Sequence, residues 1–418
     1  MGVNMSENII YLNENLLNIK FTPIPVYIDW AVINNKNVQK QFCLIGLRDT
    51  IQEVEIIDNL SDFIIEHWWN KEYNTQRRHC SNVIKFLNWI LENRRKYKIS
   101  NLSDLKLDHG TYFLNSFIGT SVSRDTVQRY ERTLKYFYLW LSKKNVLEHI
   151  SPNSFVKKEG LFGTYIESPF KNVRYPNYKP KSTGHLIPLR YIPLFIEIAI
   201  IEASPIALGI YLQIFGGLRT SEVVNIKRTQ MLRRVNSGDF LVKLKNQNFR
   251  TDIKNASGGN YVKKKRDQMI FQIHDWGNIL FRDHCSLYKP IDGSGALFVN
   301  RSGKAMTYAS YYQHFNKVKN AFISFLKEYG KPQDKLVANS LERLSWNAHI
   351  GRGTFTNLLA DEVTNPYDLA FLRGDASLLS SLDYMVATSR YRDLMNNKIS
   401  TMHSDYIPRL IKRNETKS

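Results

Sequence analysis

The spacing of apolar residues between Leu60 and about Val156 predicts a bundle of helices. Apolar side chains recur there at three- and four-residue steps, for example from Val83 to Leu91 and from Thr126 to Leu141. This is the period of helices that bury one face. Such helices need a shared core, so we expect this segment to fold as one helical unit.

The pattern changes after residue 187. A long apolar helix is expected from Ile192 to Ile214, and an alternating run from Phe240 to Lys245 predicts a strand. A Gly-rich turn separates this strand from a second one over Lys263–Ile273, and the remainder to about Lys398 is expected to be mostly helical. The chain is therefore predicted to be mostly α with a small β-sheet or hairpin.

Two further segments complete the expected organisation. Residues 166–186 contain three prolines and no helical period, which is typical of an extended linker. Residues 1–57 suggest a short helix over Asn8–Lys20 and then a hairpin, and their role is unclear. The predicted parts are 1–57, 58–165 (helical), 166–186 (linker), 187–398 (mixed helix and strand) and 399–418 (tail).

The charge of the chain favours a polyanionic partner. Its 58 Lys and Arg against 38 Asp and Glu give a net charge of +20. Residues 1–57 hold four basic and six acidic residues, residues 58–165 hold 17 and 11, and residues 166–418 hold 37 and 21. The positive charge thus covers two large segments rather than one tail. Nucleic acid is the partner we expect first.

The cysteines and the apolar runs predict an intracellular protein. Three cysteines far apart in the sequence exclude a disulfide scaffold and a Cys-rich zinc site. The first residues lack the layout of a signal peptide, and apolar runs end well short of 18 residues. We therefore expect a soluble chain in a reducing compartment, with no membrane partner.

Basic residues lie opposite the apolar stripes of the helical segment. They are candidates for contacts to DNA phosphates, although an ordinary solvated face would have the same pattern. These residues are Arg77, Arg78, Lys85, Arg124, Arg129, Arg132 and Lys135, with Lys179 and Lys181 added from the linker.

Three clusters carry residues suited to phosphate chemistry. Arg219 follows a Gly-Gly pair, and Glu222 lies three residues on, where it can orient the guanidinium. His349 and Arg352 are one helical turn apart, and a late segment from Leu378 to Asp393 carries tyrosine. Two guanidinium groups and an imidazole can hold a phosphodiester without a metal, while a tyrosine hydroxyl attacks the phosphorus. Each cluster also has a purely structural reading, because buried Arg–Glu pairs and core histidines are common.

The order of these clusters resembles the three boxes of the tyrosine recombinases, the phage-integrase family. Gly217–Val223 resembles the G-L-R-x-S-E-[LV] box, and His349-x-x-Arg352-x-Thr-Phe resembles the H-x-x-R-x-T-F box. The stretch Leu372–Asp375, with Tyr384 nine residues after Asp375, is similar to the L-G-[HW]-x8-Y ending. The resemblance covers about residues 58–400.

The resemblance implies a fold and a set of roles. The fold is a helical core-type DNA-binding domain and a mixed α/β catalytic domain, which together form a C-shaped clamp around DNA. Arg219 and Arg352 would bind the scissile phosphate, His349 would be the acid/base imidazole, and Tyr384 would be the nucleophile that forms a 3′-phosphotyrosyl link. No cofactor and no metal are implied. The lysine that protonates the leaving oxygen is assigned to Lys254, with Lys263, Lys264 and Lys265 as rivals.

Two positions depart from the family pattern. Asp375 occupies the second-histidine position, and Gly353 replaces the usual histidine after the second arginine. Tyr391 is a fallback nucleophile, seven residues later than the spacing requires. Asp375 keeps open a catalytically inactive or accessory sequence-specific DNA-binding protein. A type IB topoisomerase-like strand relaxase, which shares the chemistry, is the other alternative.

The resemblance also implies partners and a setting. The partner is double-stranded DNA carrying specific recombination sites, and the assembly on DNA is a homotetramer. In this family a C-terminal segment commonly docks on the next protomer, a role open here to residues 399–418, although a frayed tail is equally compatible with the sequence. The setting is the cytoplasm of a prokaryote, with integration, transposition or resolution of a phage or mobile element as the task.

Overall fold

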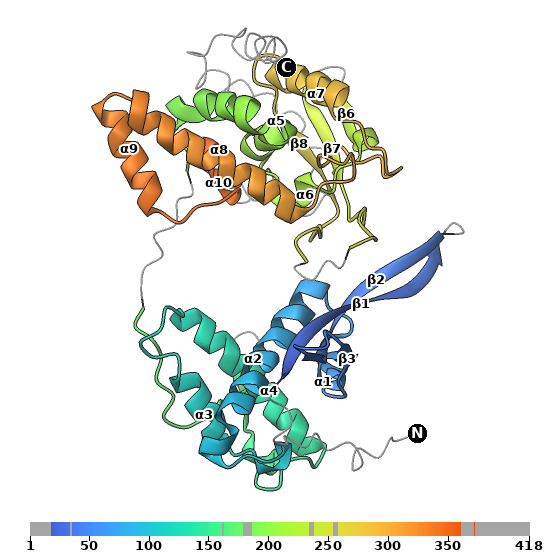
Figure 1. The fold of residues 1–418 in the computed structure, drawn as a ribbon, viewed down its shortest axis with the longest axis vertical. Coiled ribbons are helices and arrows are strands. Elements are labelled where there is room, and N and C mark those ends of the chain that lie inside the picture. Colours follow the sequence, from blue (N-terminus) through green and yellow to red (C-terminus); the bar gives the residue numbers. More distant parts are fainter. Residues whose placement is uncertain are drawn as a thin grey trace. The chain divides into compact units, whose positions relative to one another are not determined.

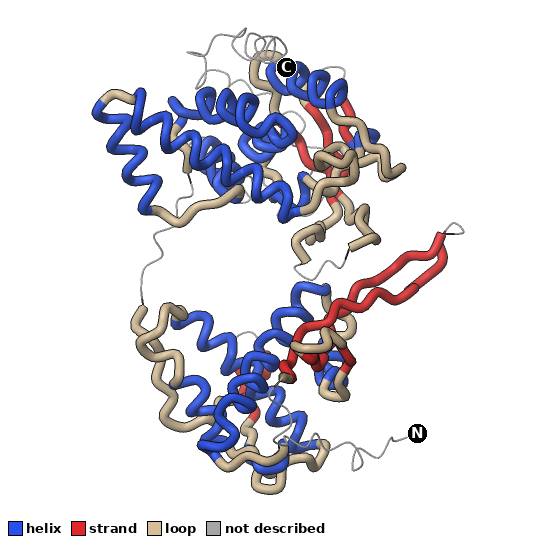
Figure 2. Tube along the Cα trace, in the orientation of Figure 1, coloured by secondary structure: helices blue, strands red, loops and turns tan. Residues whose placement is uncertain are grey.

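The chain forms two compact units, Met1–Pro180 and Lys181–Ser418. The computed structural model describes residues 18–33, 36–160, 163–178, 186–233, 238–253 and 258–360, together with Leu372. Helices predominate in the described residues of both units, and the strands form small antiparallel sheets (Figure 2). The predicted fold class, mostly α with small β elements, is confirmed. The clamp around DNA stays a prediction.

The first unit is built around two long helices, α2 and α4, which contact each other. Their interface contains a buried polar cluster, in which Thr133 of α4 contacts two side chains of α2, His79 at 2.9 Å and Asn82 at 2.8 Å. The described elements of this unit are β1 (Ile19–Ile33), β2 (Lys36–Asp49), β3 (Glu55–Ile57), α1 (Ser61–Trp68), α2 (Tyr73–Tyr97), α3 (Leu107–Asn115), α4 (Arg124–Lys143), β4 (Lys157–Gly160) and β5 (Gly163–Ile166).

A long hairpin of β1 and β2, extended by β3, packs on α2 and α1 (Figure 1). The predicted hairpin is present, and its strands pair from Ile19↔Asp49 to Ile33↔Lys36. Asn88 of α2 accepts from the Phe21 amide at 2.8 Å and donates to its carbonyl at 3.0 Å. Residues 18–57 therefore share the core of the helical unit. The predicted helix over Asn8–Lys20 falls mostly outside the described residues, and Ile19 and Lys20 begin β1.

The first half of the predicted linker also packs on this unit. Phe170 is buried, and its ring lies so close to Gly110 of α3 that a Cβ there would come within 2.3 Å of it. Asn115 donates to the Asn172 carbonyl and accepts from the Arg174 amide at 2.7 Å. Residues up to Arg174 thus run along α3 instead of leaving the unit.

In the second unit, α5 is the central helix and contacts α7, α8, α10 and β8. Together with the preceding turn it spans Leu189–Gly216 and is long and apolar enough to cross a membrane, but 67% of its most apolar window is buried inside the unit. It is therefore the core helix here. The described elements are α5 (Ile192–Gly216), α6 (Thr220–Val223), β6 (Met231–Arg233), β7 (Phe240–Leu244), β8 (Arg266–Ile270), α7 (Trp276–Leu287), α8 (Tyr308–Tyr329), α9 (Pro332–Arg343) and α10 (His349–Ala360).

Strands β6, β7 and β8 form an antiparallel sheet in that order. The predicted strand pair corresponds to β7 and β8, which pair from Phe240↔Ile270 to Leu244↔Arg266. Directly after β8, the Phe271 amide donates to the Phe215 carbonyl at 3.0 Å. This bond joins the end of β8 to the end of α5, the point at which the first box begins.

Candidate active site

Gly217 ends α5 in a conformation that favours glycine. Its φ is +64°, and its amide donates to the Gln213 carbonyl at 3.1 Å, which caps the helix. A Cβ at this position would lie 2.6 Å from Cδ1 of the buried Phe355, a residue of the second box. The sharp turn and the close approach both need glycine, and together they set the direction in which the chain continues to Arg219.

We expect Gly217→Ala to destabilise the second unit by about 2–5 kcal/mol. A left-handed conformation costs a non-Gly residue about 1–2 kcal/mol, and overpacking against Phe355 adds about 1–3 kcal/mol. Gly238→Ala is the matched control, because Gly238 has φ +72° but open space around a Cβ. The midpoint of thermal unfolding should fall further for Gly217→Ala. Equal shifts in the two variants would contradict the packing role of Gly217.

Glu222 joins two arginines. Its Oε1 accepts from Nη1 of Arg219 at 2.9 Å and from Nη1 of Arg266 at 2.7 Å. Its Oε2 accepts from the backbone amide of Arg219 at 2.8 Å and from Nη2 of Arg266 at 3.0 Å. A carboxylate offers about four acceptor positions, so those of Glu222 are all used. The predicted pairing of Glu222 with Arg219 is present in the structure, and Arg266 adds a second, bidentate partner.

This cluster has an excess of positive charge next to a partly accessible guanidinium. Burial alone would raise the pKa of the Glu222 carboxyl, but hydrogen bonds and charge from Arg266, with those of Arg219, together lower the pKa below its usual value. The ionised form of Glu222 is therefore favoured between the two guanidinium groups. The Arg219 side chain remains 29% exposed. The arrangement suits the binding of an anion by Arg219.

Arg352 brings the second box to the first. It lies on α10, is only 2% exposed, and donates from Nη1 to the Gly217 carbonyl at 2.5 Å. Next to it, Gly351 allows α10 to approach α5 closely, because a Cβ there would lie 2.7 Å from Cβ of Gln213. Two residues that are 133 positions apart in the sequence, Arg219 and Arg352, are thereby held at the same turn.

The other residues of the second box, His349, Thr354 and Phe355, differ in burial and in their contacts. His349 is the exposed first residue of α10, and its amide donates to Oδ1 of Asn347 at 2.9 Å. It lies one helical turn before Arg352. Thr354 is buried and accepts from the Ile187 amide at 3.0 Å, and Phe355 lies under Gly217. Thr354 and Phe355 therefore hold α10 in place, whereas His349 lies exposed at the start of the helix.

Several predicted residues lie outside the described part of the chain. They are the predicted nucleophile Tyr384 and its fallback Tyr391, and the preferred general acid Lys254. Asp375 of the third box and the linker residues Lys179 and Lys181 also lie outside it. The rivals Lys263, Lys264 and Lys265 are described and exposed, and they precede β8 instead of lying on it. Leu372, the first residue of the third-box stretch, is buried and accepts from Nε2 of Gln268 at 2.8 Å.

The sequence reasoning missed Arg266 and Gln268. Both lie on β8, whose side chains alternate between buried and exposed in phase with the core residue Ile270. Since alternate residues of a strand share a face, Arg266 and Gln268, which lie four and two positions before Ile270, point inward with it. The alternation was the available signal, and the preceding run of lysines concealed it.

In the first unit, α2 and α4 present a basic face. Its exposed members are Arg78, Lys85, Arg124, Arg129 and Arg132, which we call the basic face. Burial, together with the positive charges of Arg78 and Arg132, lowers the pKa of His79 to about 4, so these two arginines flank one position between the helices. Arg77 is instead half-buried, and Lys135 donates to the Ile166 carbonyl at 2.5 Å.

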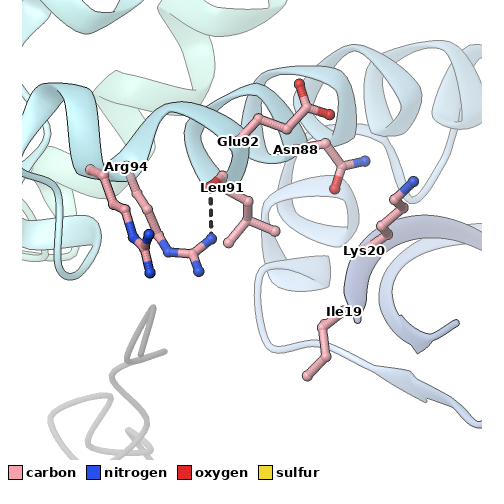
Figure 3. Close-up of a pocket in the computed structure, with 7 residues that line it drawn as sticks. Ile19, Lys20, Asn88, Leu91, Glu92 and Arg94 are labelled. Atoms are coloured by element: carbon pink, nitrogen blue, oxygen red, sulfur yellow. Dashed lines mark hydrogen bonds between the residues drawn. The ribbon is translucent and has the colours of Figure 1, made fainter. Parts of the chain in front are cut away.

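A pocket of about 310 Å³ lies between the start of β1 and α2 (Figure 3). In it, Arg94 donates from Nη1 to the Leu91 carbonyl at 2.8 Å. The pocket belongs to the first unit, whereas the arginines of the boxes belong to the second, so it is not part of the candidate active site. Its lining residues are Ile19, Lys20, Asn88, Leu91, Glu92, Arg94 and Arg95.

Among the described residues, no three His, Cys, Asp or Glu gather in a way that could hold a metal ion.

No family model and no curated protein matches the chain. One solved structure similar to it is that of the XerH site-specific recombinase bound to a palindromic difH substrate in a post-cleavage complex. The two chains are 19% identical with a TM-score of 0.48, and the match covers 75% of this chain and 77% of that one. The Tn1549 transposon integrase in complex with circular intermediate DNA has 16% identity and a TM-score of 0.47, with 78% and 94% covered. A lambda integrase tetramer bound to a Holliday junction has 12% identity and a TM-score of 0.46, with 84% and 96% covered. These proteins are all tyrosine recombinases.

Proposed function

We propose that this protein is a site-specific DNA recombinase of the tyrosine recombinase type. The observation that carries the proposal is the bond from Arg352 to the Gly217 carbonyl, two residues before Arg219. It joins the two boxes at one turn of the second unit, which supports the proposal that Arg219 and Arg352 bind one phosphate. Arg is suited to this task because its planar fork stays charged and donates to two phosphate oxygens at once.

In the proposed reaction, the Tyr384 hydroxyl attacks a phosphodiester of one DNA strand. A bond forms between the tyrosine oxygen and phosphorus, and the bond to the 5′ oxygen breaks, which leaves a 3′-phosphotyrosyl link. His349 takes the proton of the Tyr384 hydroxyl, and Lys254, or one of its rivals Lys263, Lys264 and Lys265, gives a proton to the leaving 5′ oxygen. Arg219 and Arg352 stabilise the charge that develops on the phosphate. The reverse attack by another strand's 5′ hydroxyl rejoins the DNA, so no cofactor is required.

The proposed substrate is double-stranded DNA, bound by both units as a clamp. The basic face of α2 and α4 would contact phosphates, and such contacts position the protein without reading the sequence. Strand exchange needs two pairs of protomers, so we propose a homotetramer on DNA with residues 399–418 as a contact between protomers. An element that integrates, excises or resolves DNA in a prokaryotic cytoplasm is the proposed setting.

The test is to trap the protein on DNA. The purified protein is incubated with fragmented DNA from its own genomic neighbourhood, and covalent complexes are isolated under denaturing conditions and sequenced. A duplex made from the recovered site, with a nick beside the cleavage position, should then give a covalent adduct at the 3′ end that EDTA does not suppress. Specific binding without any adduct would contradict the proposal and identify an accessory DNA-binding protein. Cleavage that requires a divalent metal would contradict it as well.

A further inference from the structure

Strand β8 carries two polar side chains on its buried face. Arg266 is 7% exposed and Gln268 is 3% exposed, and both lie in line with the core residue Ile270. Polar groups at such positions are costly unless they are hydrogen-bonded. Their partners are therefore informative about what these two residues do.

The partners form a continuous chain of hydrogen bonds. Arg266 holds Glu222 with two bonds, and Glu222 holds Arg219. On its other side, Arg266 donates from Nε to Oε1 of Gln268 at 3.0 Å. Gln268 then donates from Nε2 to the Leu372 carbonyl at 2.8 Å. The chain runs from a guanidinium of the first box to the backbone of the third-box stretch, twelve residues before Tyr384.

The chemistry of the groups sets the direction of each bond. A guanidinium only donates, so the Gln268 amide must turn its oxygen toward Arg266. Its NH₂ group then faces the Leu372 carbonyl, which only accepts. The fork of Arg266 requires one placement of Glu222, because a bidentate pair is specific in geometry. Each member of the chain thus sets the orientation of the next.

We propose that Arg266 and Gln268 are positioning residues that hold Arg219 and the nucleophile segment in register across β8, an inference that rests on the proposed function. Arg266 acts on the phosphate through Glu222 and Arg219. Gln268 acts on the nucleophile through the backbone at Leu372. Neither residue touches the DNA itself.

Two variants separate these roles. Gln268→Glu keeps an acceptor for Arg266 but removes the donor to the Leu372 carbonyl, so it should loosen only the nucleophile segment. Arg266→Lys keeps the charge beside Glu222 but removes the fork, so it should loosen Arg219. Each should slow adduct formation on a nicked duplex about 10- to 100-fold, the scale expected for misplaced reacting groups. DNA affinity should stay within about twofold, because the basic face is unchanged.

The decisive measurement is the rate of adduct formation on a second substrate. In this substrate a single-isomer methylphosphonate replaces the scissile phosphate. This group lacks the negative charge that Arg219 would neutralise. The defect of Arg266→Lys, measured against the unmodified protein on each substrate, should therefore shrink on the methylphosphonate. The defect of Gln268→Glu should persist, because the nucleophile is still misplaced. A merely structural role would lower the rates on both substrates equally in both variants, and that result would overturn the inference.

Asp267→Asn is the matched control, because Asp267 lies on the same strand with its side chain exposed. It should react like the unmodified protein on both substrates. Circular dichroism and DNA binding establish that each variant is folded, and if Arg266→Lys fails to fold, Gln268→Glu tests the link to Leu372 alone. Adduct formation by Gln268→Glu at the unmodified rate would overturn that link. Absence of any adduct with the unmodified protein would instead contradict the proposed function itself.

Discussion

Tyr384→Phe is expected to abolish the covalent adduct and to leave DNA binding unchanged. The substitution removes only the phenolic oxygen, which is the proposed nucleophile, and keeps the aromatic ring. Loss of a nucleophile lowers the rate by more than about 10³-fold in enzymes that use one. The measurement is the yield of denaturation-resistant adduct on a nicked duplex, with the dissociation constant for the same duplex determined in parallel.

Tyr391→Phe is the control for this experiment. Tyr391 belongs to the same segment but lies seven residues later than the spacing of the third box requires. The adduct should form normally in this variant. If Tyr384→Phe still formed the adduct while Tyr391→Phe did not, the nucleophile would be Tyr391.

Arg352→Lys is expected to slow adduct formation about 10²- to 10³-fold, the scale of losing one preorganised donor to a developing charge. One N–H of Arg352 is already used by the Gly217 carbonyl, and the side chain is almost fully buried. A guanidinium carries five N–H donors, and we expect the fork of Arg352 to hold the phosphate as well as this carbonyl. A lysine ammonium at this depth cannot satisfy the carbonyl and also hold two phosphate oxygens.

Arg343→Lys serves as the comparison, because Arg343 is an exposed residue at the end of α9. Its adduct formation should equal that of the unmodified protein. Thermal unfolding separates a chemical defect from a folding defect in Arg352→Lys. A variant that is folded, binds DNA and reacts at the normal rate would contradict a role for Arg352 in holding the phosphate.

Much of the fold follows from local patterns. Helical spacing predicted the segment that contains α2 and α4, and alternation predicted β7, because periodicity depends only on which side of an element is buried. The Gly-rich turn after β7 predicted its partner strand β8. The first two boxes likewise indicated Arg219, Arg352 and their shared chemistry. The first half of the linker was harder to foresee. Its prolines excluded a helix, but nothing local indicated that Phe170 would be buried against Gly110.

Residue types and their spacing were enough to define the helices, the strand pair and the two arginines of this protein, since each depends on neighbours along the chain. The polar chain across β8 could not be found in this way. Arg266 reaches Glu222 over 44 positions, and Gln268 reaches Leu372 over 104. Contacts at such separations depend on how a strand packs against the end of a helix, and this packing is set by the whole core rather than by any local period.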